Sequence, residues 1–183
     1  MFLYEVDEKI TLRLLNFDDT ADLFKLIDAS RAYLRKWLPW LDNNTTEEDS
    51  KQFIDHAYQL YANRQSLTAG IFYNEKLIGM TGYNQLDWTN HIGYIGYWIA
   101  PQYQGMGVMT RSVRAMIDYG FQVLELNRVD IRAAYENKKS RAIPERLGFR
   151  TEGQIRQAEW LYDHYVDHVI YGILKWEWLH GAK

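Results

Sequence analysis

The feature that most constrains the fold is a glycine-containing loop between an apolar run and a helical pattern. The run 92–99 is apolar and bounded by turn residues, as in a buried strand. The loop 102–107, QYQGMG, follows it, and over 108–122 apolar residues recur at helical spacing. Two glycines let a backbone approach an anion, and the N-terminal end of the next helix carries partial positive charge. By itself, the loop fits either an ordinary strand-to-helix turn or a pyrophosphate site.

Two common nucleotide-binding motifs do not fit this loop. A Walker loop continues with Gly-Lys-Ser/Thr, whereas Val108-Met109-Thr110 follows the second glycine here. A dinucleotide fingerprint needs a third glycine and an opening βαβ unit, whereas the strand 92–99 continues a hairpin meander.

The rest of the chain predicts a mixed sheet around this loop. Alternation and apolar runs predict strands at 10–14, 67–73, 76–83, 92–99, 128–134, 149–155 and 168–174. Capping residues and spacing predict helices after 18–19 and after 45–49, and over 108–122 and 138–147. The helix 108–122 should cross over between two parallel strands. The expected fold class is α/β (α+β), with a mixed, mostly antiparallel sheet flanked by helices.

The composition of the chain excludes several classes of function. The chain has 183 residues, which fits one domain over 1–183. It has no cysteine, which excludes disulfides, iron–sulfur clusters and a cysteine nucleophile. A net charge of −3 argues against direct nucleic-acid binding. No run approaches the roughly 20 apolar residues of a membrane helix, and nothing resembles a signal peptide, so we expect no membrane contact and a cytoplasmic location.

Aromatic residues are unusually frequent, at 15% of the chain. A mean hydropathy of −0.43 does not fit a membrane protein, so the rings should line a core or a binding surface. Trp176 and Trp178 allow two expectations: contact with a second copy in a homo-oligomer, or packing back onto the sheet.

Five motifs, in this order, are similar to those of GNAT-family N-acetyltransferases, and within them to the RimJ/RimL-type ribosomal-protein N-terminal acetyltransferases. They are WLPW at 37–40, QYQGMGVMT at 102–110, Asn137 with Ser140, ERLGF at 145–149 and QAEW at 157–160. The resemblance covers about residues 10–174, nearly the whole chain.

The resemblance implies the GNAT fold, in which two parallel central strands, here 92–99 and 128–134, splay apart to admit the pantetheine arm of acetyl-CoA. We expect no metal in the site. The expected cofactor-binding residues are Tyr97, Trp98, Ile99, Gln104, Gly105, Met106, Gly107, Val108, Met109 and Asn137. Strand backbone would bond pantetheine, loop amides would take the pyrophosphate, and Asn137 would lie near the reactive end. Asn137 by itself also fits a plain helix N-cap.

The same resemblance assigns the chemistry. Glu159 is expected to be the general base, directly or through a water, although without the resemblance it fits a solvated loop carboxylate. Ser140 is expected to protonate the thiolate, or only to hydrogen-bond the sulfur, because serine is a weak acid. Trp37, Trp40 and Trp160 are expected to border the acceptor.

The sequence leaves several classes of acceptor amine open. At pH 7 an α-amino group is about 14% neutral and a lysine about 0.04%, so a protein N-terminus needs less help from a base. With the resemblance, this favours direct acetyl transfer from acetyl-CoA to the N-terminus of a protein, expected to be ribosomal. The alternatives are a small-molecule amine acetyltransferase, for a polyamine or drug, and a non-catalytic acyl-CoA-binding module.

Two sets of ionisable residues are relevant to the choice between these classes of function. The acidic residues near the WLPW motif would suit a cationic acceptor of either kind; they are Asp42, Glu47, Glu48 and Asp49. His164 and His168 are expected to pack at the surface or at a strand edge rather than to bind a metal.

Overall fold

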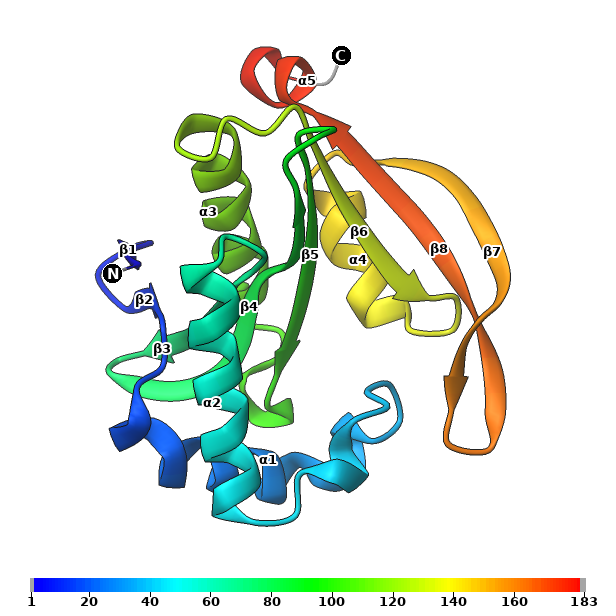
Figure 1. Ribbon diagram of the computed structural model, residues 1–183. Helices are drawn as coiled ribbons and strands as arrows, with labels where there is room; N and C mark the ends of the chain where they lie inside the picture. Colours follow the sequence, from blue (N-terminus) through cyan, green and yellow to red (C-terminus); the bar gives the residue numbers. More distant parts are fainter. Residues whose placement is uncertain (1, 182–183) are drawn as a thin grey trace.

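The computed structural model describes residues 2–181, which form a mixed sheet with helices on both faces (Figure 1). The sheet has eight strands in the order β1-β2-β3-β4-β5-β6-β8-β7, and all neighbours are antiparallel except β5 and β6. The strands are β1 (Leu3–Glu5), β2 (Ile10–Arg13), β3 (Leu67–Tyr73), β4 (Lys76–Asp87), β5 (Ile92–Ile99), β6 (Arg128–Ala134), β7 (Arg150–Leu161) and β8 (His164–Leu174).

The helices pack on both faces of this sheet. They are α1 (Thr20–Leu34), α2 (Glu47–Ala62), α3 (Val108–Gln122), α4 (Lys138–Arg146) and α5 (Lys175–His180), with 3₁₀ turns at Phe17–Asp19, Leu41–Asn43 and Pro101–Tyr103. Within residues 2–181, none of the helices has the length and apolar character needed to cross a membrane.

Each face of the sheet has its own apolar cluster, because successive side chains of a strand point to opposite sides. On β3, Ile71 belongs to the cluster that includes Phe121 of α3, whereas its neighbour Phe72 belongs to the cluster that includes Leu23 of α1 and Ile54 of α2. Helices α1 and α2 therefore cover one face, and α3 covers the other.

Most of the predicted elements are confirmed. The strand 92–99, the helix 108–122 and the strand 128–134 agree residue for residue with β5, α3 and β6. The predicted hairpin is present as β3 and β4, although β4 continues four residues further than the pattern predicts, to Asp87.

The C-terminal hairpin differs from the prediction. The pattern predicts strands over 149–155 and 168–174, whereas β7 and β8 both extend further, to the turn that joins them. A bulge between Ile155 and Glu159 interrupts the alternation, and almost every side chain of β7 is exposed, so no period-two apolar signal exists there. Strand β1 and helix α5 were missed because they are too short for a periodic pattern.

The two C-terminal tryptophans behave differently. Trp178 packs against the α3 side of the core, and its indole nitrogen donates to Asp118 Oδ1 at 2.7 Å. Trp176 is exposed. Trp178 therefore packs back onto the α3 side of the domain, and the homo-oligomer stays a prediction.

The parallel pair β5–β6 is hydrogen-bonded over only part of its length. Its register runs from Ile92 opposite Arg128 to Ile95 opposite Ile131. In the described chain, residues 96–99 of β5 pair only with β4, and residues 132–134 of β6 pair only with β8. The facing edges diverge, as Figure 1 shows, and the predicted splay of the central strands is confirmed.

Close packing between α3 and β4 gives a stability prediction. The hydroxyl of buried Tyr83 donates to the Met116 carbonyl at 2.8 Å, and a Cβ on Gly120 would come within 1.9 Å of that hydroxyl oxygen. We expect Gly120→Ala to lower the free energy of unfolding by about 1–3 kcal/mol through overpacking. In a Tyr83→Phe background the hydroxyl is gone, and the nearest ring atom lies 2.9 Å from the Cβ position of residue 120. Gly120→Ala should therefore lower the free energy of unfolding by less in that background. Urea unfolding of the wild type, the two single variants and the double variant measures this. An equal loss of unfolding free energy in both backgrounds would contradict the prediction.

Candidate active site

A cavity of about 1250 Å³ lies where β5 and β6 separate. Residues 95–99 of β5 and 132–134 of β6 line it, together with the first turns of α3 and α4 and the segment 37–40. The backbone groups on the two open strand edges have no partner strand, and buried backbone groups need hydrogen bonds. An extended ligand with amide groups can supply them as an added strand does.

The loop 102–107 closes one end of the cavity. Gly105 and Gly107 have φ angles of 76° and 71°, and a Cβ on either would meet no atom within 4 Å. Gly107 is the N-cap of α3, whose first turn contains no acidic residue and whose first amides have no intrahelical acceptor. These donors and the positive end of α3 form a site suited to an anion.

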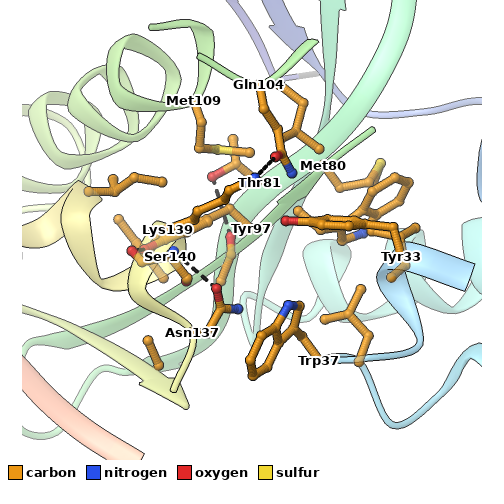
Figure 2. A pocket seen from close by; sticks show the side chains of 18 of the residues that line it. Tyr33, Trp37, Met80, Thr81, Tyr97, Gln104, Met109, Asn137, Lys139 and Ser140 are labelled. Carbon is orange, nitrogen blue, oxygen red and sulfur yellow. Dashed lines mark hydrogen bonds between the residues drawn. The ribbon is translucent and has the colours of Figure 1, made fainter. Parts of the chain in front are cut away.

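Cationic side chains surround the same end of the cavity. Lys139 Nζ donates to Gln104 Oε1 at 3.0 Å, a bond that reaches from α4 to the loop (Figure 2). Arg146 donates to the Thr110 hydroxyl at 2.6 Å, and Arg111 lies one residue further along α3. All three cations line the cavity and favour a negatively charged ligand there.

Helix α4 faces β5 across the cavity, and two hydrogen bonds fix its start (Figure 2). Asn137 Oδ1 accepts from the Ser140 amide at 3.2 Å, so Asn137 is the N-cap of α4. The Tyr97 hydroxyl donates to the Ser140 carbonyl at 2.8 Å. Burial raises the pKa of Tyr97 well above its usual range, so this hydroxyl keeps its proton at neutral pH. Ser140 itself lines the cavity.

The opposite side of the cavity is aromatic and apolar. Side chains from α1, the segment after it and α2 line it, namely Tyr33, Trp37, Leu38, Pro39, Trp40 and Phe53. The ring of Trp40 lies 6.2 Å from that of Trp98 on β5, centroid to centroid. This wall offers apolar contact to an acceptor and no carboxylate.

A side chain from the β7–β8 turn holds this wall in place. The Tyr162 hydroxyl donates to the Leu38 carbonyl and accepts from the Leu41 amide at 3.2 Å. The Arg35 guanidinium lies 3.8 Å from the centre of the Tyr162 ring. The C-terminal hairpin is thereby tied to the segment 37–40 that lines the cavity.

One carboxylate, Glu159, lines the cavity in the described chain. Its Oε2 lies 3.2 Å from Nε2 of His168, which also lines the cavity. The structure places Glu159 on β7 and leaves its side chain 26% exposed, so it is not a solvated loop carboxylate.

Most of the residues expected in the site line this cavity. They are Trp37, Trp40, Tyr97, Trp98, Ile99, Gln104, Gly105, Gly107, Val108, Met109, Asn137, Ser140 and Glu159. Met106 is exposed and does not line it. Trp160 does not line it either, because it follows Glu159 on a strand and points to the opposite face. There its ring meets Tyr165 edge-on, with centroids 4.8 Å apart.

The acidic residues expected near the acceptor lie elsewhere. Asp42 pairs with Arg35 through two hydrogen bonds of 2.8 Å, which lower the pKa of Asp42. Asp49 caps the first turn of α2, and Glu47 and Glu48 are exposed. None of the four lines the cavity, which corrects the expectation that they give the acceptor side a negative charge.

The two histidines of the C-terminal hairpin do not share a site. His164 Nδ1 lies 2.6 Å from Asp163 Oδ1, whereas His168 faces Glu159. Within residues 2–181, no group of three or more histidine, aspartate or glutamate side chains could hold a metal ion.

Sequence reasoning missed the roles of Tyr162 and His168. No local signal could have found Tyr162, because its partner Leu38 lies 124 residues away in the chain. The sequence predicts His168 at the surface or at a strand edge, but the partner that it faces depends on the β7 bulge, which the sequence does not show.

Comparison with known proteins identifies the family. A family model described as an acetyltransferase (GNAT) domain matches residues 9–150. The chain belongs to the GNAT acetyltransferase family. It is therefore an acetyltransferase, and the predicted fold and family resemblance are confirmed.

Three relatives are informative about this GNAT acetyltransferase. The chain is 40% identical over 179 residues to YdaF of Bacillus subtilis (strain 168), provisionally named a ribosomal N-acetyltransferase, covering 97% of this chain and 98% of YdaF. The microcin C7 self-immunity acetyltransferase MccE, solved with acetyl-CoA and AMP, is 30% identical with a TM-score of 0.89, covering 92% and 94% of the two chains. RimL, a ribosomal L7/L12 α-N-protein acetyltransferase solved with coenzyme A, is 25% identical with a TM-score of 0.91, covering 94% and 98%.

The contact made by Tyr162 gives a prediction about local stability. We expect Tyr162→Phe to speed amide hydrogen exchange around Leu38 and Leu41, because both hydrogen bonds to the hydroxyl are lost. Tyr165→Phe is the matched control, since Tyr165 lies on the same hairpin and is exposed. Unchanged exchange at Leu41 in Tyr162→Phe would show that the hairpin does not hold this segment.

Proposed function

We propose that this GNAT acetyltransferase transfers an acetyl group from acetyl-CoA to the α-amino group of a protein N-terminus. The composition of the cavity carries the proposal: in the described chain, Glu159 is the one carboxylate that lines it, and the acceptor side is aromatic and apolar. A chain terminus brings a single amine followed by uncharged backbone, which suits such a wall. A polyamine brings several cations, whose burial there would be costly without paired carboxylates.

The other half of the cavity supports acetyl-CoA as the donor. The open edge of β5 at 97–99 can pair with the amides of pantetheine, and the amides of 104–109 can bind the pyrophosphate at the start of α3. Lys139 and Arg146 would add positive charge beside the phosphates. The structures of MccE with acetyl-CoA and RimL with coenzyme A add support.

The reaction requires a neutral amine and a proton for the departing thiolate. About 14% of an α-amino group is neutral at pH 7, so Glu159 has only to remove one proton from an ammonium whose pKa is low compared with that of a lysine, directly or through a water. Ser140 lines the cavity and can donate to the sulfur or hydrogen-bond it. Tyr97 is not assigned the acid role, because its proton is engaged by the Ser140 carbonyl. Without a cysteine, direct transfer in a ternary complex is the simplest route.

A ribosomal protein is the proposed acceptor among protein N-termini. The names of YdaF and RimL support this choice. Sequence identity alone does not decide the acceptor class, because MccE, which acts in immunity to microcin C7, is 30% identical and RimL is 25% identical. In the described chain no acidic side chain besides Glu159 lines the cavity, and this is what argues against a polycationic acceptor.

The acceptor class is tested by mass spectrometry. We expect acetyl-CoA and the enzyme to add one acetyl group to ribosomal proteins with free N-termini, and to short peptides that copy those N-termini. The same peptides with a blocked N-terminus and an internal lysine are the control and should stay unmodified. Acetylation of spermidine or of the blocked peptides, with none of the free N-termini, would refute the proposal.

The role of Glu159 gives a second prediction. Glu159→Gln should lower kcat by about 100-fold or more, because the substitution removes the base but keeps the shape of the side chain. Glu48→Gln is the matched control, since Glu48 is exposed and lies outside the cavity. A non-catalytic acyl-CoA-binding module would show coenzyme A binding by calorimetry, no turnover, and no response to Glu159→Gln.

The phosphate loop gives a third prediction. Gly107→Ala should raise the KM for acetyl-CoA by about tenfold, because alanine is strained at a φ of 71° and relief of that strain would displace the loop amides that are proposed to bind the pyrophosphate. Gly153→Ala is the control, since Gly153 also has open space around it but lies in β7 without a positive φ. Equal KM values for the two variants would place the pyrophosphate elsewhere.

A further inference from the structure

Glu159 and His168 form an isolated pair in the cavity. Nε2 of His168 lies 3.2 Å from Oε2 of Glu159, and the two side chains are 21% and 26% exposed. In the described chain, neither side chain makes another hydrogen bond or ion pair. A carboxylate can only accept, so the His168 nitrogen that faces it must carry the proton.

The backbone is built to bring these two side chains together. Ile155 lies opposite His168, but Glu159 lies opposite Val166, so β7 has two extra residues over this interval. In a regular ladder residue 157 would face Val166, and Glu159 would lie two positions further from His168. Directly opposed residues share a face, as do residues two apart, and Glu159 therefore becomes a diagonal neighbour of His168.

The bulge has its own support, from the residue next to His168. Asp167 accepts from the Gln157 amide at 2.8 Å and from the Gln154 side chain at 2.7 Å. These bonds lower the pKa of Asp167 and hold Gln157 at a φ of 50°, which is unfavourable for a glutamine. Backbone strain is thus maintained where it sets the position of Glu159.

We propose that His168 is a positioning residue for Glu159, an inference that rests on the proposed function. Its Nε2–H fixes one oxygen of the carboxylate and leaves the other to take the proton from the acceptor ammonium. The freed lone pair forms the C–N bond to the acetyl carbon, and the C–S bond breaks with its electrons on sulfur. The second proton leaving nitrogen neutralises the thiolate, and the first returns from Glu159 to solvent. His168 stays a donor throughout.

A double-mutant cycle tests the positioning role. His168→Phe should lower kcat by about 10-fold to 100-fold and leave the KM for acetyl-CoA unchanged, since misplacing a catalytic group impairs only the chemical step. His168→Gln should recover most of the loss, because its amide nitrogen can donate from nearly the same position. In the Glu159→Gln background, adding His168→Phe should lower kcat no further. Additive losses, or a glutamine no better than phenylalanine, would overturn the proposal.

Controls separate positioning from folding. His164→Gln is the matched variant, since His164 lies on the same strand but bonds Asp163, and its kcat should equal that of the wild type. If His168→Phe does not fold, His168→Asn replaces it in the cycle, because its shorter amide cannot reach Glu159.

A readout without acceptor separates this inference from the proposed function. In the NMR spectrum of the free enzyme, the Nε2-bound proton of His168 should be protected from exchange, and Glu159→Ala should remove that protection. If this protection from exchange is absent in the wild type, or persists in Glu159→Ala, the pairing of Glu159 with His168 is overturned whatever the acceptor is. If the enzyme acetylates another amine but no N-terminus, the proposed function fails, and the cycle with that amine still decides the role of His168.

Discussion

The structure depends on the point at which β5 and β6 stop pairing, after Ile95 and Ile131. Parallel strands that separate leave two rows of backbone donors and acceptors without partners, which is costly unless something else binds them. The cost is limited because each strand keeps its outer neighbour: β4 follows β5 to Ile99, and β8 follows β6 to Ala134. The opening is therefore a stable feature of the sheet, and the cavity lies directly in it.

Two contacts connect the parts that the opening separates. Near the start of α4, the Tyr97 hydroxyl of β5 holds the Ser140 carbonyl. At the far end of the hairpin, Tyr162 bonds the segment that follows α1. Both contacts are made by a tyrosine hydroxyl, and both join residues distant in sequence. The walls of the site are thus held by a few specific hydrogen bonds rather than by a continuous sheet.

Charge is divided between the two ends of the cavity. Three cations and free amides lie around the glycine loop, whereas the one carboxylate that lines the described cavity is paired with an imidazole, and Arg132 of β6 lines the cavity as well. Such a division suits a donor that carries phosphates and an acceptor that carries one amine. Of the four acidic residues expected near the acceptor, Asp42 instead forms an ion pair with Arg35, Asp49 caps α2, and Glu47 and Glu48 are exposed.

The sequence by itself determined the elements whose signal is local. Apolar spacing and the two glycines located β5, the loop and α3 to the residue, because strand period, helix period and turn chemistry act over a few positions. Most of the site residues that it predicted through the family motifs line the cavity, including Glu159.

Only the tertiary structure decided what these residues face. The bulge in β7 rests on long-range pairing with β8 and on Asp167, so no local pattern shows that Glu159 meets His168 or that Trp160 turns away. Likewise, the position of Asp42 depends on its ion pair with Arg35, the residue that follows α1. Contacts of this kind depend on register and packing between distant segments, and these are fixed only when the chain has folded.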